Sequence, residues 1–369
     1  MVRADARRVG VRIELLVDSD EFWDRVRIDL AEARSYAYLQ TFSFEGDRVG
    51  ISTGKRLEAC GADDRRFLVD GYSLLSQNDR IIYGPAWLER RFRREFFLTH
   101  RWVRRLRDAG VGVRFGKPVG PSPVRIIRRS HKKLAVFDDR VTYLGGINFC
   151  DHNFEWHDMM LRVEDPDLAA HVAEDFRANW VGEAVPSDRT FGPLRVISLN
   201  GRSNPRGFVP VLEAIASARR RIDVVSAYLS PPFTDHLARA SQRGVHVRVL
   251  TPAMNNKPNL ARFILEAACR HRFSILHYPD RMNHMKAMMI DEELLIAGSS
   301  NFDSMGYHIL EELFLMTRDP EVVGAFRKRV WDPDVARSRP VHPSSTWLTR
   351  FGHRSIRIGS ALAQVFALP

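Results

Sequence analysis

One pattern of residues occurs twice in this chain of 369 residues, and it limits the possible folds more than any other feature. The copies read HKKLAVFDDRVTYLGGINF from His131 and HMKAMMIDEELLIAGSSNF from His284. Counted from each histidine, Lys follows at +2, Asp at +7, Gly at +14 and Asn at +17. A single His-x-Lys would mean little, whereas two copies with every offset kept indicate a duplicated structural unit.

The histidine and lysine of each copy precede an apolar run that we expect to be a central strand. Residues two apart on a strand project from the same face, so each copy supplies one imidazole and one ammonium together. Buried cations without partners are costly, and a cleft that binds an anion resolves this. The following Gly145-Gly146 and Gly298-Ser299 allow a phosphate to approach closely, and asparagine amides can donate to it. We therefore predict phosphate-binding residues Asn148, Asn301, Gly146 and Ser299.

Two such half-sites facing each other would surround one phosphoryl group. One imidazole can then attack phosphorus to give a phosphohistidine, while the other protonates the leaving alkoxide and later deprotonates the incoming alcohol. The lysines and asparagines would stabilise the non-bridging oxygens. The predicted catalytic residues are His131, Lys133, Asp138, His284, Lys286 and Asp291. No cluster of acids and histidines has metal-ligand spacing, so we expect neither a metal ion nor another cofactor.

Each imidazole also needs a partner that fixes its tautomer. Asp158 and Glu312 are the predicted histidine-orienting residues, because they stand 27 and 28 residues beyond the two histidines beside apolar, strand-like runs. Glu312 could instead be a surface residue. Asp138 and Asp291 complete the motif, but their position after a strand suits hydrogen bonds that anchor the strand end better than proton transfer.

The order of strands and helices repeats along with the motif. RIELLV, a helix around residues 21–34 that Asp18 and Ser19 can cap, and YAYLQTFSF correspond to RVISL, FVPVLEAIASARRR and IDVVSAYLS. HLARASQRG before VHVRVLTP corresponds to the helix over residues 102–110 before VGVRF. This alternation predicts an α/β fold with two similar halves, each a mixed sheet flanked by helices.

The domain boundaries follow from the repeat. We predict a first half over residues 1–180, a linker over 181–192, a second half over 193–330, and a basic amphipathic tail over 331–369.

Composition narrows the class of partner. The 56 Lys and Arg exceed the 45 Asp and Glu by 11, which favours anionic partners such as nucleic acid, anionic lipid or phosphorylated substrates. Arginine-rich solvated helices would give the same excess. Three widely spaced cysteines suit a reducing compartment, and no window holds the ~18 apolar residues needed to span a bilayer. We expect a cytoplasmic protein that is soluble or peripheral.

Two segments combine basic and apolar residues. The predicted helix over residues 87–107 interleaves arginines with aromatic residues, which suits a membrane surface, a substrate entrance or an ordinary buried aromatic face. In the tail, one helical face can carry Leu348, Phe351, Ile358, Leu362 and Val365. That face could bind an anionic bilayer or cap the core.

The duplicated HxKxxxxD pattern resembles the signature of the phospholipase D superfamily. SHKKLAVFD with GGIN, EWHD after the first motif and GSSNFD after the second are similar to bacterial cardiolipin synthases, and the similarity runs over residues 12–329. The resemblance implies two halves about a pseudo-two-fold axis with the active site at their interface. It implies that His131 is the nucleophile and His284 the general acid and base.

The resemblance also implies a reaction. Two phosphatidylglycerol molecules would give cardiolipin and glycerol, on a protein peripherally associated with the inner (cell) membrane. The chain departs from the family after GSSNFD, where Ser304-Met305-Gly306 replaces a common Arg-Ser pair, and this leaves the acceptor alcohol open. A phospholipase D hydrolase or transphosphatidylase and a phosphodiesterase nuclease are alternatives on the same site. A silent phosphate-binding protein would be expected to have degenerate motifs, and both motifs here are complete.

Overall fold

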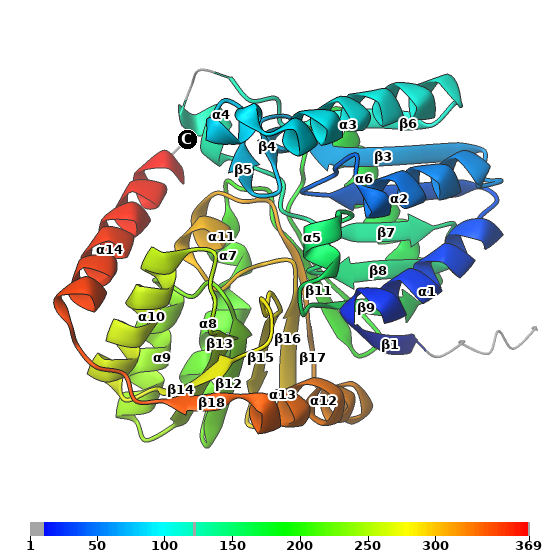
Figure 1. Ribbon diagram of the computed structural model, residues 1–369. Coiled ribbons are helices and arrows are strands. Elements are labelled where there is room, and N and C mark those ends of the chain that lie inside the picture. The colour runs from blue at the N-terminus through cyan, green and yellow to red at the C-terminus, as the bar shows by residue number, and fades with distance from the viewer. Residues whose placement is uncertain (1–10, 121–122, 368–369) are drawn as a thin grey trace, which may run out of the picture.

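The computed structural model of the chain describes residues 11–120 and 123–367, so the ends of the predicted first half and tail, 1–10 and 368–369, lie outside the described residues. Two large mixed sheets flanked by helices form the molecule, one from each half (Figure 1). The predicted fold class, with its two similar halves, is confirmed.

The first half forms a seven-stranded sheet in the order β1-β9-β8-β7-β2-β3-β6. Its strands are β1 (Arg12–Val17), β2 (Tyr36–Thr41), β3 (Asp64–Asp70), β6 (Gly112–Gly116), β7 (Leu134–Phe137), β8 (Val141–Gly145) and β9 (Met159–Glu164). Its helices are α1 (Asp18–Glu32), α2 (Arg48–Ala59), α3 (Arg90–Asp108), α4 (Pro123–Ile127), α5 (Asp151–Phe154) and α6 (Pro166–Val181). A small hairpin of β4 (Ser76–Gln77) and β5 (Arg80–Ile81) and the short helix η2 (Pro85–Leu88) precede α3.

The second half repeats this order in a nine-stranded sheet, β10-β11-β17-β16-β15-β12-β13-β14-β18. Its strands are β10 (Ser187–Phe191), β11 (Leu194–Ser198), β12 (Arg221–Ser226), β13 (His246–Pro252), β14 (Ser274–Tyr278), β15 (Lys286–Ile290), β16 (Leu294–Gly298), β17 (Leu313–Thr317) and β18 (Arg339–Val341). Its helices are α7 (Asn204–Gly207), α8 (Val209–Ser217), α9 (Phe233–Gln242), α10 (Pro258–His271), α11 (Ser304–His308), α12 (Pro320–Phe326), α13 (Asp332–Arg337) and α14 (Trp347–Ala367).

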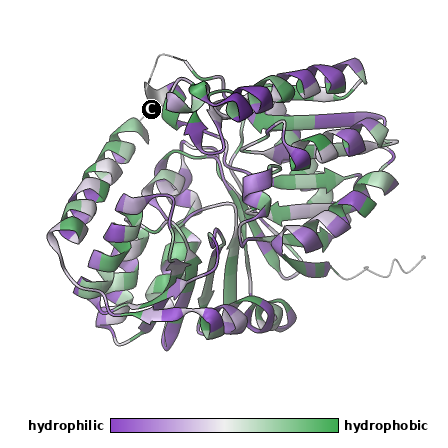
Figure 2. Cartoon of the chain, viewed as in Figure 1, coloured by the Kyte–Doolittle hydropathy of each residue, from purple (hydrophilic) through white to green (hydrophobic). Residues whose placement is uncertain are grey.

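The strands within the two motifs are central, as their apolar sequences predict. All residues of β7 and β15 are buried, and each strand has neighbours on both sides within its sheet. Figure 2 shows mostly hydrophobic colouring on the strands and mixed colouring on the helices that cover them. These central strands therefore position both motifs within their sheets.

One hydrophobic core joins the halves. It contains inward-facing residues of both sheets together with Phe176 of α6, Phe326 of α12, and Trp331 in the helical segment that follows α12. Separate outer cores cover the far face of each sheet, with α1, α2 and α3 on one and α8, α9 and α10 on the other. Because the central core draws on both sheets, separating the halves would expose buried apolar surface on each.

Two edge strands lie in segments for which the sequence predicted no strand. The segment 181–192 is not only a linker, because β10 forms the edge of the second sheet and pairs antiparallel with β11. The tail 331–369 likewise contributes β18, which pairs with β14 at the other edge. Short edge strands with exposed charged residues give little apolar signal, which explains why they were not predicted.

The predicted correspondence of the later helix–strand units was wrong. By position in the sheet, β13 corresponds to β3, while β6 corresponds to β14. Both β3 and β6 follow a helix. The charged residues DRR at the start of β3 made it hard to recognise as a strand from the sequence.

Asp18 and Ser19 do not cap α1. The Asp18 carboxylate contacts His157 and Arg281, and Ser19 donates to the carbonyl of Phe154.

A buried ion pair beside the first motif also contacts the second half through the hydroxyl of Ser198. Lys132 Nζ lies 2.8 Å from both oxygens of Asp175 in α6 and 2.8 Å from Ser198 Oγ in β11. Lys132 is 0% and Asp175 8% exposed, so neither charge has access to bulk water as an alternative.

We predict that Asp175→Ala lowers the free energy of unfolding by about 3–5 kcal/mol, because it leaves the Lys132 ammonium buried and unpaired. Asp188→Ala is the control: it breaks the exposed Arg195–Asp188 pair and should cost at most about 1 kcal/mol. Urea unfolding of both variants measures the difference. Equal stability of the two would contradict the prediction.

Candidate active site

Two isolated β-bridges hold the motif histidines at the interface between the two halves, which we call the seam. Ser130 pairs in parallel with Glu311, and His157 pairs in parallel with Asn283. The His131 amide donates to the carbonyl of Glu311, and the His284 amide donates to the carbonyl of His157, both at 2.8 Å. Each histidine is therefore fixed to the segment of the other half that carries a predicted orienting carboxylate.

His131 contacts Glu312 across the seam. Its Nδ1 lies 3.0 Å from Glu312 Oε1 and 3.2 Å from the carbonyl oxygen of Ser299. Both neighbours are acceptors, so Nδ1 must carry the proton, and in the neutral ring Nε2 is left with its lone pair. Burial, then the charge of Lys133, and further the charge of Lys286, lower the pKa of His131. The ring is therefore neutral near pH 7.

His284 contacts Asp158 in the reciprocal direction. Its Nδ1 lies 2.7 Å from Asp158 Oδ2, but also 2.7 Å from Lys286 Nζ. Burial and the neighbouring charge of Lys286 lower the pKa of His284 to about 3, against the opposing effect of Asp158. Both predicted orienting residues thus reach a histidine, and each reaches that of the other half.

The two lysines lie beside their own histidines. Lys133 donates to the carbonyl of His131 at 2.7 Å, and Lys286 contacts the carbonyl of His284. Burial lowers the pKa of Lys133 to about 7 and also lowers the pKa of Lys286. Lys286 further lowers the pKa of Lys133 from across the seam. The halves therefore share one electrostatic site.

The carboxylates keep their charge in this site. Burial alone would raise the pKa of Asp158 and of Glu312, but nearby positive charge and hydrogen bonds outweigh it and hold both below their usual values. The main opposing partner of Asp158 is Lys286, and that of Glu312 is His131.

Asp138 and Asp291 lie away from the histidines and lysines of their own motifs. They follow β7 and β15, at the strand ends opposite to the histidines. Asp138 accepts from the backbone amides of residues 34–36, and Asp291 from those of residues 219–221. Each thereby ties the end of its motif strand to the start of the neighbouring strand.

Gly146 and Ser299 lie against the carboxylates, where we had predicted a phosphate. A Cβ on Gly146 would come within 2.2 Å of Asp158 Oδ1, so the missing side chain makes room for that carboxylate. Ser299 Oγ instead donates to Glu312 Oε2 at 2.5 Å. Gly145 and Gly298 allow close backbone contact with the next strand, since added Cβ atoms would lie 2.3 Å from Met159 O and 2.5 Å from Leu313 O.

The two asparagines differ in their surroundings. Asn148 Oδ1 accepts from Thr41 Oγ1 and the Phe42 amide, and its Nδ2 donates to Asn153. It therefore holds the loop after β2, and one N–H of its amide is already used. Asn301 is 4% exposed, and its Oδ1 has no hydrogen-bond partner among the described residues.

Sequence reasoning missed three aromatic residues around the imidazoles. Phe42 lies edge-on to His131 with ring centroids 5.3 Å apart, and Lys133 Nζ lies 5.6 Å from the Phe42 ring centroid. Trp156 and Tyr228 lie 4.8 and 6.0 Å from the His284 ring. The available signal was position: Trp156 stands two residues before Asp158, and Phe42 and Tyr228 follow β2 and β12.

An apolar pocket of about 650 Å³ lies at the β4–β5 hairpin, η2 and α3, lined by residues that include Tyr83, Trp87 and Phe96. The hairpin connects to the site, because Asp79 accepts from Asn256 and Asn256 accepts from Tyr228. In the segment predicted to be a basic aromatic helix, Phe92 and Trp102 are buried, whereas Leu88 and Phe97 are exposed.

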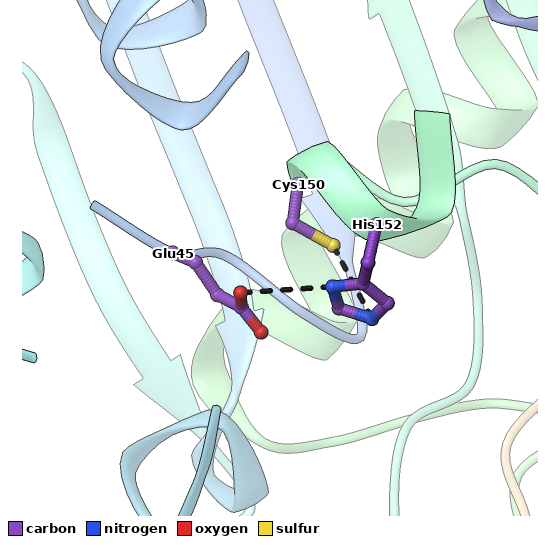
Figure 3. Close-up of side chains that lie close together, drawn as sticks. All are labelled: Glu45, Cys150 and His152. Carbon is purple, nitrogen blue, oxygen red and sulfur yellow. Dashed lines mark hydrogen bonds and ion pairs between the residues drawn. The ribbon is translucent and has the colours of Figure 1, made fainter. Parts of the chain in front are cut away.

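Metal-ligating side chains gather elsewhere in the first half. Within the described residues, Glu45, Cys150 and His152 form one group that could hold an ion (Figure 3). Glu45, Asp47 and Glu95 form another. In the first group, His152 Nδ1 lies 3.6 Å from Glu45 Oε2. Burial opposes protonation, but the nearby charge of Glu45 outweighs it and raises the pKa of His152. An ion pair accounts for this contact without a metal.

Comparison with known proteins identifies the family. Residues 2–180 and 211–332 match the family described as "Cardiolipin synthase, PLD-like domain". The chain belongs to this family. It is thereby an enzyme of the phospholipase D type, a phosphatidyltransferase.

Individual relatives are distant but cover most of the chain. Cardiolipin synthase A of Pseudomonas putida (strain W619) is 24% identical over 96% of this chain and 74% of its own length. Cardiolipin synthase B of Salmonella typhimurium is 25% identical over 85% and 78%. The crystal structure of phosphatidylserine synthase from Haemophilus influenzae Rd KW20 superposes with a TM-score of 0.69 at 13% identity, covering 96% of this chain and 95% of that chain, which shows a shared fold.

We predict that anion binding weakens as pH rises through about 7. The lowered pKa of Lys133 means that its ammonium is present below this pH and is lost above it. The affinity for sulfate, whose charge is constant over this range, should fall by up to about tenfold per pH unit. Lys133→Arg stays charged and should remove the dependence. Calorimetric titration from pH 6 to 9 measures both, and a flat wild-type profile would contradict the assignment.

We also predict that Gly146→Ala displaces Asp158 and removes most turnover of a phosphodiester, while costing about 1–3 kcal/mol of stability. Gly324→Ala is the control, because no atom lies within 4 Å of its added Cβ. It should leave turnover unchanged and stabilise α12 by roughly 0.5–1 kcal/mol. Wild-type activity of folded Gly146→Ala would show that the position of Asp158 does not matter.

Proposed function

We propose that the enzyme is a cardiolipin synthase, which transfers the phosphatidyl group of one phosphatidylglycerol to the glycerol of a second through a phosphohistidine on His131. The observation that carries the proposal is the pair of imidazole–carboxylate contacts that cross the seam in opposite directions. The names of the two relatives support the substrate class.

The surroundings of each Nδ1 divide the two roles. His131 Nδ1 faces only acceptors, which leaves its Nε2 lone pair free to attack phosphorus. An N–P bond forms while the bond from phosphorus to the glycerol oxygen breaks. His284 donates the proton that the departing glycerol needs. In the second step His284 takes the proton of the acceptor hydroxyl, the new P–O bond forms, and the N–P bond breaks.

Binding of the anionic substrate favours protonation of His284. Burial and Lys286 keep the pKa of His284 near 3, so the ring is neutral. A phosphate oxygen attracts the Lys286 ammonium away from Nδ1, and its negative charge favours the imidazolium. Nδ1–H then donates to Asp158 alone. Lys133 and Lys286 stabilise the charge on the non-bridging oxygens.

The proposed setting is the inner face of the cell membrane, where the donor and acceptor lipids are found and where the excess of 11 positive charges favours anionic lipid.

We predict that purified protein incubated with phosphatidylglycerol yields cardiolipin and glycerol, detected by lipid mass analysis. His131→Ala and His284→Ala should each lower turnover on the order of 10²- to 10⁴-fold or more with the fold intact. His236→Ala on α9 is the matched control and should be fully active. An acid-labile, base-stable phosphohistidine should form in the wild type and be absent from His131→Ala.

Other products would redirect the proposal. Phosphatidic acid without cardiolipin would identify a hydrolase, and nicked plasmid DNA would identify a nuclease. Retained turnover in both histidine variants would rule the mechanism out.

A further inference from the structure

Helix α14 exposes an unpartnered apolar face, which we call the α14 stripe. Its residues share one side of the helix and are from 38% to 70% exposed: Trp347, Leu348, Phe351, Ile358, Leu362 and Val365. The five residues that the sequence placed on one face are all among them. Scattered single apolar residues are ordinary on a protein surface, but six along one helix face form a contiguous patch.

The opposite face fixes the orientation of the helix. Thr349 donates to the buried Glu266 of α10, and the His353 ring stacks on Phe263 with centroids 5.0 Å apart. Ser360 donates to Ser304 of α11, and Ala363 is 4% exposed. Because these contacts are specific, α14 cannot turn its stripe inward without losing them. The tail therefore caps the core with one face and leaves the other free.

The positive charges beside the α14 stripe indicate which kind of partner binds it. Between Trp347 and Ala367 there is no acidic residue, and exposed Arg350 and Arg354 lie along the stripe. A second copy packed on the stripe would bring these like charges together, which is unfavourable. An anionic bilayer instead satisfies both components, because acyl chains take the apolar side chains and phosphate groups take the guanidinium groups.

The helix is also connected to the loops that carry the active site. Ser304, which receives the Ser360 hydrogen bond, follows Asn301 by three residues. Near the C-terminal end of α14, the carbonyl of Phe366 accepts a hydrogen bond of 3.0 Å from Arg128. Arg128 precedes His131 by three residues. Figure 1 shows α14 along the outer edge of the second half, with its end beside α4. None of the described helices is long and apolar enough to cross a membrane.

We propose that α14 lies flat in the surface of an anionic phospholipid bilayer, with the α14 stripe among the acyl chains, and thereby holds the active site against its lipid substrate. This rests on the proposed function for the nature of the substrate. At ~1.5 Å per residue, the helix would lie along about 30 Å of membrane.

The test replaces three stripe residues with a polar helix former: Ile358→Gln, Leu362→Gln and Val365→Gln in one variant. The control carries Ile28→Gln, Val181→Gln and Val209→Gln, which are exposed aliphatic residues on α1, α6 and α8. Co-sedimentation with phosphatidylglycerol–phosphatidylcholine vesicles should fall at least about tenfold for the stripe variant and stay unchanged for the control. Arg350→Gln with Arg354→Gln should weaken binding to these vesicles and reduce its salt dependence.

Two activity measurements separate this proposal from the proposed function. The stripe variant should lose turnover on vesicles but keep turnover on short-chain, monodisperse phosphatidylglycerol. If no form of the wild type converts phosphatidylglycerol, while the stripe variant still loses vesicle binding, the proposed function fails and the docking surface stands.

Unchanged vesicle binding by the stripe variant would overturn the docking proposal. So would a lipid-free wild-type dimer that the stripe variant converts to a monomer, because the stripe would then be a contact between copies. Matching unfolding curves of stripe and control variants establish that the helix remains folded.

Discussion

The active site depends on imidazole–carboxylate contacts that cross between the halves. His131 takes its orienting acid from the second half, and His284 takes its acid from the first. Neither half therefore supplies the carboxylate that contacts its own histidine. The backbone bridges at Ser130–Glu311 and His157–Asn283 hold these contacts in register, and the shared core of α6, α12 and both sheets prevents the halves from separating. Duplication and catalysis are thus linked, because the two motifs complete one site only at the interface.

This interface concentrates charge away from water. Asp158 and Glu312 remain charged, while burial lowers the pKa of both histidines and both lysines. The cationic forms are the ones that a dry site disfavours. An incoming phosphodiester brings the negative charge that makes them favourable again. In the proposed mechanism, substrate binding therefore favours protonation of the site and produces the form of His284 that can act as an acid.

The sequence predicts the features of this fold that repeat. Strict offsets within the two motifs indicate two similar halves, and apolar runs identify β7 and β15 as central strands. Other features depend on tertiary contacts that no spacing reports. Residue spacing relates Asp158 to His131 and Glu312 to His284 equally well, but the packing of the halves pairs each acid with the other histidine. The short edge strands β10 and β18 are defined by the neighbours with which they pair.

The two half-sites meet one requirement with different side chains. The shorter Asp158 reaches His284 past Gly146, where a Cβ would lie 2.2 Å from the carboxylate. The longer Glu312 reaches His131 with Ser299 at the corresponding position, and the serine hydroxyl holds the carboxylate. Lys286 adds a donor at Nδ1 of His284, whereas Nδ1 of His131 has only acceptors. In the proposed mechanism, this difference leaves Nε2 of His131 with a lone pair for attack on phosphorus, and His284 gains its proton once a phosphate draws Lys286 away. The proposed two-step transfer thus depends on a difference between the two copies at Nδ1 of their histidines.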